Sequence, residues 1–149
     1  MRAVVQRVRS AQVSVEGEVA CQMGEGLLAL VGVGQADTAE SAAALAHRIV
    51  HLRIFGDESD RMNRSLLDTG GTLGIVPQFT LYGDARHGRR PSFLAACPAG
   101  QAVSLIEAVV DAARGFGAPV VTGEFQTAME VSLVNSGPVT ILLDTEKLF

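Results

Sequence analysis

Two polar stretches hold the residues of this chain whose types and spacing could do chemistry. The first begins at Pro77 and continues with Gln78, Phe79 and Thr80, directly after an apolar run that predicts a buried strand. It leads into a loop that contains a histidine and three arginines: Arg86, Arg89 and Arg90. A rigid strand would carry the polar side chains to its edge, and a basic loop beside them favours an anionic ligand.

The side chains of this first stretch suit a ligand with hydroxyl groups. Gln78 can both donate and accept hydrogen bonds, as a ribose hydroxyl requires. Thr80 carries a hydroxyl that could act as a weak nucleophile, although the sequence places no base beside it. The plainer alternatives are an edge residue facing water for Gln78, a β-branched strand residue for Thr80, and a solvated loop for the arginines. Both interpretations stay open on these residues alone.

The second stretch spans residues 135–140 and contains the pair Gly137-Pro138 between two strand-like runs. A proline that follows a glycine predicts a constrained turn. A fixed turn that points backbone carbonyls into a pocket would reject, by steric clash, a substituent on the wrong side of a carbon atom. The alternative is an ordinary turn. We expect the two stretches to act together.

The sequence has none of the usual groupings of catalytic residues. It contains no G-x-S-x-G motif, no motif that places serine, histidine and aspartate together, and no metal-ligand spacing. Its 16 carboxylates are scattered over predicted loops and helix faces. Catalysis would therefore rest on positioning and on oriented backbone N–H groups, which suits an activated substrate such as an ester better than an amide.

Two further motifs suggest cofactors. Gly32 and Gly34 precede a predicted helix, as in dinucleotide-binding oxidoreductases, but the third glycine of that fingerprint and the acidic residue about 20 positions later are missing. His47 and His51 are spaced i and i+4, which could clamp a metal, but no carboxylate stands beside them and Arg48 would oppose a cation. We predict a tight turn and two surface histidines, with no metal and no cofactor.

Composition and charge limit the class of protein. The chain has 149 residues, which predicts one domain over residues 1–149, and its net charge of −4 argues against general nucleic-acid binding. Its eleven arginines could still hold a few phosphates where they cluster. Cys21 and Cys97 are too few for a disulfide framework and fit core residues in a reducing cytosol. No apolar run approaches about 18 residues, and the first residues lack a signal peptide, so we expect a cytoplasmic protein without membrane contact.

Hydrophobic periodicity predicts the elements that must position these residues. A helix from Asp37, with Glu40 completing a capping box, has four apolar residues at helical spacing: Ala42, Leu45, Ala46 and Ile49. A second helix begins at Pro98 and has five: Ala102, Val103, Ile106, Val110 and Ala113. The predicted strands cover residues 1–9 continuing through 13–15, then 18–23, 27–33, 65–67, 72–81, 120–123, 128–134 and 139–143.

Tight turns join several of these strands, and residues 68–71 are typical of a hairpin turn. The two helices stand singly between groups of strands. We therefore predict an α+β fold of antiparallel, curled or barrel-like β-sheets with two helices, rather than a doubly wound parallel sheet.

The two polar stretches resemble those of the D-aminoacyl-tRNA deacylase family. The similarity is carried by residues 77–82, 90–93 and 135–140 and by the opening residues 1–8, in the order and spacing of that family. It runs from residue 1 to about residue 145. The family's first motif is usually Ser-Gln-Phe-Thr-Leu, and only its serine differs here, where Pro77 stands.

The resemblance implies a cytosolic homodimer that hydrolyses the ester between a D-amino acid, or glycine, and the terminal adenosine of the tRNA CCA end. Gln78 and Phe79 would line the adenosine and ester site, with the Phe79 N–H facing the ester carbonyl and Thr80 beside it. Gly137 and Pro138 match a Gly-cisPro pair that, in the family, reaches into the partner subunit's pocket and excludes L-amino acids. In the family view the tRNA's own 2′-hydroxyl assists the attacking water, which agrees with the missing base.

Pro77 removes both the hydroxyl and the N–H of the family's serine, so activity would fall if that serine acted through either. A related branch with looser chiral discrimination also has proline here, but alanine where Phe79 stands, so we place this chain with the main group. The alternative is a dimer that kept the fold and binds a tRNA end or a nucleotide without catalysis. We add the hypothesis that the loop arginines contact phosphates of the CCA end: Arg86, Arg89 and Arg90.

Overall fold

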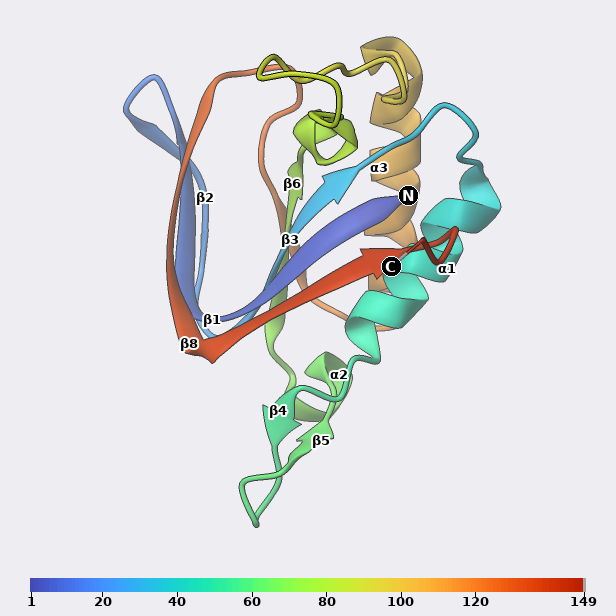
Figure 1. Ribbon diagram of the computed structural model, residues 1–149. Helices are drawn as coiled ribbons and strands as arrows, with labels where there is room; N and C mark the ends of the chain where they lie inside the picture. The colour runs from blue at the N-terminus through green and yellow to red at the C-terminus, as the bar shows by residue number, and fades with distance from the viewer. Residues whose placement is uncertain (149) are drawn as a thin grey trace.

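Strand β1 (Arg2–Val15) organises the sheet because it pairs with three other strands. Its first half pairs antiparallel with β3 (Gly26–Gly32), and its second half pairs antiparallel with β2 (Glu18–Met23). Its other edge pairs antiparallel with β8 (Met129–Asp144) over almost its whole length. The computed structural model describes residues 1–148 and shows β1 and β8 bending together, so that the sheet curls into a barrel-like shape (Figure 1).

The other half of the sheet is parallel. β6 (Thr72–Pro77) pairs with β3, and β7 (Val120–Thr122) pairs with β6. Parallel neighbours need long crossover connections, and the chain supplies α1 (Ala39–Val50) between β3 and β6 and α3 (Ala99–Gly115) between β6 and β7. The predicted α+β class with a curled sheet is confirmed. The pairing is mixed where we expected antiparallel strands throughout, because strand periodicity alone does not give strand direction.

The strand predicted over residues 65–67 and the hairpin turn predicted over residues 68–71 are wrong. This segment forms a short third helix, α2 (Leu66–Thr69). Ser65 and Asp68 cap it reciprocally, since the Asp68 N–H donates to the Ser65 hydroxyl at 3.2 Å and the Ser65 N–H donates to the Asp68 carboxylate at 2.8 Å. A glycine with a left-handed φ of 67° ends the helix, so the turn-forming residues serve as helix caps.

Three other segments depart from the prediction. The strands predicted over residues 128–134 and 139–143, and the turn between them, form one continuous strand, β8. β4 (Phe55–Gly56) and β5 (Met62–Arg64) make a separate two-stranded antiparallel sheet in a segment for which we predicted no strand. The strand predicted over residues 72–81 ends at Pro77, and a 3-10 turn follows it, η1 (Phe79–Tyr82).

Helix α1 begins one residue later than predicted. Thr38 is its N-cap, and Thr38 and Ser41 form the capping box in place of Asp37 and Glu40. The Asp37 carboxylate instead accepts the Gly34 N–H at 2.7 Å. The predicted apolar face is buried, with one valine added: Ala42, Leu45, Ala46, Ile49 and Val50.

Helix α3 packs beside α1 on one face of the sheet, and the main core lies between the sheet and these two helices (Figure 1). Pro98 is the N-cap of α3 rather than its first residue, and Val109 takes the buried position that we assigned to Val103. A smaller apolar cluster lies on the inner side of the curled sheet: Val8, Ala11, Val13, Leu28 and Val76.

His47 in α1 and His51 directly after this helix are exposed, as predicted. The rings of His47 and His51 stack with their centroids 4.2 Å apart, and both meet the ring of Phe116 edge-on. Cys97 is buried and Cys21 is half-buried. Within residues 1–148, no helix is long and apolar enough to cross a bilayer.

Gly26 is expected to be essential for the pairing of β3 with β6. A Cβ atom there would lie 1.9 Å from the carbonyl oxygen of Thr72, so Gly26→Ala should lower the free energy of unfolding by about 3 kcal/mol. Urea denaturation measures this loss. The matched control is Gly115→Ala, where a Cβ would meet no atom within 4 Å and the change should stay within about 1 kcal/mol. Equal stability of the two variants would contradict the prediction.

Candidate active site

A pocket of about 730 Å³ opens where β3 and β6 end. The strand ends and the start of η1 form one wall, residues 93–99 and the first turns of α3 form the second, and residues 125–131 form the third. The carboxyl ends of neighbouring parallel strands are a common place for ligand sites. Six of the lining residues bear on the chemistry: Pro77, Gln78, Phe79, Phe93, Cys97 and Phe125.

The predicted residues Gln78, Phe79 and Thr80 lie together at this pocket. Gln78 and Phe79 line it, and the Gln78 amide nitrogen donates a hydrogen bond to the Thr80 hydroxyl. The Phe79 side chain is 58% exposed, and its ring meets the ring of Phe93 edge-on with 5.1 Å between the centroids. An aromatic pair with open faces at a pocket offers a stacking surface to a planar ring such as a nucleobase.

The backbone N–H of Phe79 is available to a ligand. The first N–H groups of a helical turn have no acceptor within that turn, and η1 begins at Phe79. No backbone carbonyl among residues 1–148 accepts this N–H, whereas the preceding Gln78 N–H donates to the Val31 carbonyl at 2.8 Å. The strand pairing thus ends at Gln78 and leaves the next donor beside the pocket.

Pro77 stands at a position of β6 that needs no backbone donor. It is in register with Val31 of β3, and the following N–H, of Gln78, is directed to β3. Since backbone N–H groups alternate sides along a strand, an N–H at position 77 would point toward β7. The β6–β7 ladder has already ended at Ile75 and Thr122. Proline therefore removes no hydrogen bond of the sheet.

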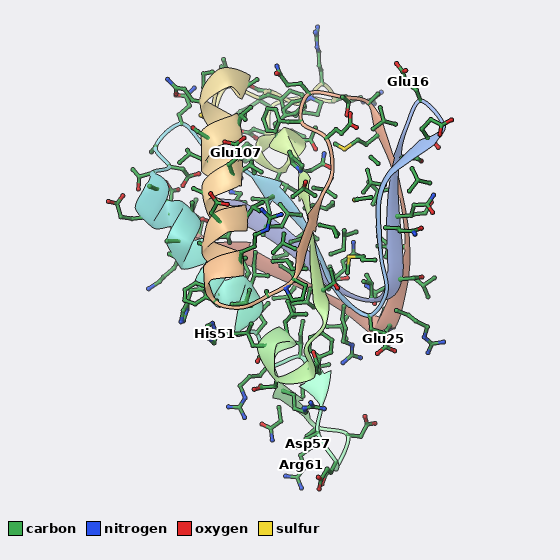
Figure 2. The ribbon with its side chains drawn as sticks, turned by 180° about the vertical axis from the view of Figure 1, so that it is seen from behind. Glu16, Glu25, His51, Asp57, Arg61 and Glu107 are labelled. Atoms are coloured by element: carbon green, nitrogen blue, oxygen red, sulfur yellow. The ribbon has the colours of Figure 1, made fainter. Side chains whose placement is uncertain are left out.

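The residues that line the pocket include no carboxylate, imidazole, ammonium or guanidinium group. Cys97 is its one titratable side chain, and burial raises the pKa of this thiol, which keeps it neutral. Figure 2 shows Glu16 in the β1–β2 turn, Glu25 before β3, Asp57 in the β4–β5 connection and Glu107 on α3, and none of these four carboxylates lines the pocket. The pocket can therefore position a substrate and donate hydrogen bonds, and it offers no strong base of its own.

The three predicted loop arginines differ in their surroundings. The loop is closed at its base because Asp84 and Ser92 exchange two backbone hydrogen bonds of 2.8 Å. Arg86 forms a two-pronged ion pair with Asp84, at 2.9 and 2.6 Å, and these hydrogen bonds lower the pKa of the Asp84 carboxyl below its usual range. Arg89 and Arg90 are exposed, and no ion pair holds either of them within residues 1–148.

Gly137 and Pro138 do not line the pocket of their own chain. They lie in a bulge of β8, where the four residues 136–139 face the single residue Arg7 of β1. Arg7 pairs with Leu27 near the start of β3, whereas the pocket opens where β3 ends. Both residues are exposed, and the peptide bond between them is cis. The structure therefore does not bring the two predicted stretches together within one chain.

The bulge around Gly137 is held from both sides. The Arg7 guanidinium donates to the carbonyls of Ser136 at 2.9 Å and of Ile54 at 2.5 Å. The Asn135 side chain accepts the Val139 N–H at 2.7 Å and donates to the Val139 carbonyl at 3.0 Å. These contacts fix the backbone at the edge of the sheet, so the exposed pair is presented on a rigid support.

The third wall of the pocket was not predicted from the sequence. Phe125, Gln126, Thr127, Met129 and Val131 line it, yet we assigned part of this segment to a strand and the rest to no element. The signal that could have indicated this wall is Phe125, an aromatic residue in a polar segment between two predicted strands.

The rejected cofactor motifs occupy other environments. Gly32 and Gly34 face side chains of η1, since a Cβ at either position would meet atoms of Tyr82 within 3.2 Å. A phosphate-binding loop needs open backbone N–H groups at such glycines, and the Gly34 N–H is already bonded to Asp37. Within residues 1–148, no group of three or more histidine, cysteine or acidic side chains is placed to hold a metal ion.

The chain matches the family model described as D-Tyr-tRNA(Tyr) deacylase over residues 4–144. It is 53% identical to the D-aminoacyl-tRNA deacylase of Thermosipho africanus (strain TCF52B) over 149 residues, which covers all of both chains. It is 51% identical to the enzyme of the same name from Thermomicrobium roseum (strain ATCC 27502 / DSM 5159 / P-2), over 99% of this chain and 96% of that one.

Two solved structures have a similar fold. A protein named c-Myc DNA Unwinding Element Binding Protein superposes with a TM-score of 0.92 at 35% identity, covering 97% of this chain and 99% of that one. A probable eukaryotic D-amino acid tRNA deacylase superposes with a TM-score of 0.80 at 17% identity, covering 95% and 97%, which supports the fold alone. Because the family model spans nearly the whole chain and full-length relatives share half of its residues, this chain belongs to the D-Tyr-tRNA(Tyr) deacylase family.

Proposed function

We propose that this protein hydrolyses the ester bond of D-aminoacyl-tRNA in the cytoplasm and releases the free D-amino acid and tRNA. Glycyl-tRNA, including glycine mischarged on the tRNA for alanine, is the second substrate, since glycine has no side chain to be rejected. One observation carries the proposal: Gln78 and Phe79, the residues of the family motif, line a pocket without any ionised group. Such a pocket suits the hydrolysis of an activated ester by positioning.

The terminal adenosine of the tRNA enters the pocket, and its base lies against the aromatic pair of Phe79 and Phe93. The Gln78 amide, held by Thr80, bonds a ribose hydroxyl. The Phe79 N–H donates to the ester carbonyl oxygen and stabilises the negative charge that develops there. Water adds to the carbonyl carbon, the bond from that carbon to the ribose oxygen breaks, and the ribose oxygen takes up the proton that the water gives up. The free hydroxyl of the same ribose orients the water.

Chiral selection is assigned to Gly137 and Pro138 of a second copy of the chain. Both are exposed on a rigid bulge and lie away from the pocket of their own chain. Among residues 1–148, β8 pairs only with β1, so its other edge is unpaired, and long unpaired edges are normally covered. Three apolar side chains of this strand are exposed by 36 to 57%: Val131, Val134 and Leu142. A homodimer that covers this strand would bring each bulge to the partner's pocket, where backbone carbonyls exclude an L side chain.

Paired substrates test the activity directly. Incubation with D-tyrosyl-tRNA and with glycyl-tRNA should release the amino acid, and release from D-tyrosyl-tRNA should be at least about 100-fold faster than from L-tyrosyl-tRNA, a difference of about 2.7 kcal/mol in activation free energy. Scintillation counting of labelled amino acid measures the rates. Gln78→Ala is the inactive control for contaminating hydrolases.

The alternative function is a non-catalytic dimer that binds a tRNA end or a nucleotide. Two observations favour it: Pro77 replaces the serine of the family motif, and one protein of similar structure is named as a binding protein for a DNA element. Tight binding of D-tyrosyl-tRNA without release of tyrosine would establish this alternative and exclude the proposed hydrolase.

The loop arginines provide a second prediction. Arg89 and Arg90, which no carboxylate neutralises within residues 1–148, would contact phosphates of the CCA end, while Arg86 shapes the loop through Asp84. The double variant Arg89→Gln/Arg90→Gln should reduce the slope of log Kd against log salt concentration by about 1.4, or about 0.7 for each lost phosphate contact. Fluorescence anisotropy with labelled tRNA gives the slope.

The matched control for the loop is Arg61→Gln. Arg61 lies in the connection between β4 and β5, at the end of the molecule away from η1 (Figures 1 and 2). For Arg61→Gln, the slope of log Kd against log salt concentration should equal that of the wild type. If all variants keep the wild-type slope, the loop does not contact the phosphates.

A mixing experiment tests the shared site. A Cβ at Gly137 would lie 2.7 Å from Val139 Cγ2 and 3.0 Å from Arg7 Nη2, and its φ of 138° disfavours alanine, so Gly137→Ala should distort the bulge that completes the partner's pocket and abolish turnover there. Gln78→Ala should remove the ribose contact. After the two inactive variants are dissociated and mixed, random dimers contain one intact site in about a quarter of all sites, so about a quarter of wild-type activity should return. A mixture that stays inactive, or a monomeric wild type in light scattering, would contradict the shared site.

A further inference from the structure

The glycines of the Gly32-Val33-Gly34 motif support the turn that carries the proposed catalytic residues. A Cβ at Gly34 would lie 2.7 to 2.8 Å from the ring and hydroxyl of Tyr82. A Cβ at Gly32 would lie 3.0 Å from the Gln78 carbonyl oxygen and 3.1 Å from Leu81 Cβ. In Figure 1 the arrow of β3 accordingly ends beside this turn. The end of β3 must be free of side chains for η1 to pack on it.

Tyr82, the last residue of η1, is fixed by polar contacts around its ring. Its hydroxyl donates to the Asp37 carboxylate at 3.2 Å, and the Gly34 N–H donates to the same oxygen at 2.7 Å. The α-amino group of Met1 pairs with the other Asp37 oxygen. The Arg2 guanidinium lies 4.5 Å from the centroid of the Tyr82 ring and donates to the carbonyl of Leu81 at 3.1 Å. The ring is therefore held between a glycine and a cation.

The two ends of η1 face different surroundings. Tyr82 is 8% exposed, whereas Phe79, three residues earlier in the same turn, is 58% exposed and lines the pocket. The turn has only four residues, so a displacement of the Tyr82 end moves the Phe79 N–H as well. Misplacement of a catalytic group by about 1 Å can reduce a rate by about 100-fold.

The same strand end also holds the opposite wall of the pocket. The Gln35 N–H donates to the Ala95 carbonyl at 3.2 Å, and the Cys97 N–H donates to the Val33 carbonyl at 2.9 Å. Residues 33–35 therefore contact both η1 and residues 95–97. A side chain at Gly34 would push on a segment that connects two walls of the pocket.

We propose that Tyr82 is a positioning residue of the reaction, which fixes the Phe79 N–H through its packing on Gly34 and its hydrogen bond to Asp37. This inference rests on the proposed deacylase function. Tyr82 contacts no substrate and acts through the turn. Its effect should therefore appear in kcat rather than in KM.

Kinetics on D-tyrosyl-tRNA test the proposal with three variants. Gly34→Ala should lower kcat by about 10- to 100-fold with KM changed by less than about twofold. Tyr82→Phe, which keeps the ring and loses only the hydrogen bond, should lower kcat by a smaller factor of about three. Gly115→Ala, with no atom within 4 Å of its Cβ, is the matched glycine control and should equal the wild type.

A double variant separates positioning from general destabilisation. If the clash with the ring is the cause, Gly34→Ala should lower kcat by less than about twofold in a Tyr82→Leu background, where the ring is absent. Equal effects of Gly34→Ala in both backgrounds would overturn the proposal, as would a wild-type kcat for Gly34→Ala.

Tyr82 also supplies a readout that does not depend on activity, because it is the only tyrosine of a chain without tryptophan. Burial and the negative charge of Asp37 raise the pKa of Tyr82 above the ordinary value near 10, and the nearby Arg2 lowers it by a smaller amount. Asp144 is the other charged group near the ring, and the Met1 α-amino group pairs with Asp37. Absorbance at the phenolate band should titrate above pH 10 in the wild type and closer to pH 10 in Gly34→Ala.

The raised pKa has a defined sign in stability. The stabilisation that the raised pKa adds to the free energy of unfolding is present in full below about pH 10, where Tyr82 is neutral in both the folded and the unfolded state. It is lost as the pH rises toward the folded-state pKa. Tyr82→Phe should therefore lose less stability than the wild type above about pH 10. If the wild type releases no D-tyrosine, the proposed function fails. If Tyr82 in Gly34→Ala titrates at the same pH as in the wild type, Gly34 does not hold the ring, and the further inference fails.

Discussion

The site depends on the way two parallel strands end beside each other. The Gln78 N–H completes the pairing of β6 with β3 by donating to Val31, and the next residue begins a 3-10 turn that leaves the ladder. Pairing holds the backbone up to the last residue before the pocket, and the turn then frees one donor. Because the pocket opens at this edge, the precision of the site derives from the central sheet rather than from a flexible loop.

A pocket without ionised groups constrains both how the reaction can be activated and which substrates can react. If this pocket holds the ester, as we propose, nothing in its lining can take a proton at neutral pH, so water and substrate would supply the reactive oxygen and its activation. The uncharged lining also contains no carboxylate or cation that could catalyse the hydrolysis of other esters indiscriminately. Specificity can then rest on shape and on fixed backbone groups, which change little with pH or salt.

The sequence predicts some levels of this structure better than others. Helical spacing identifies the buried face of α1, the polar residues after an apolar run indicate that Gln78 lies at a site on the strand edge, and the family resemblance adds Phe79 beside it. The sequence did not indicate which strands pair in parallel, because the same apolar alternation is compatible with a parallel and with an antiparallel neighbour. Asp37 looks like a helix cap by its position alone, but tertiary contacts with Tyr82 and Met1 take up its carboxylate. The cap therefore moves to Thr38.

The separation of Gly137 and Pro138 from the pocket of their own chain also lies outside what spacing can indicate. Their place follows from a bulge in which four residues oppose one. The contact between Gly34 and Tyr82 has a further consequence for how such a sequence can change. The space that glycine leaves empty is the space that the aromatic ring fills. The two positions can therefore vary only as a pair, so that a larger residue at one is compatible with the fold only alongside a smaller residue at the other.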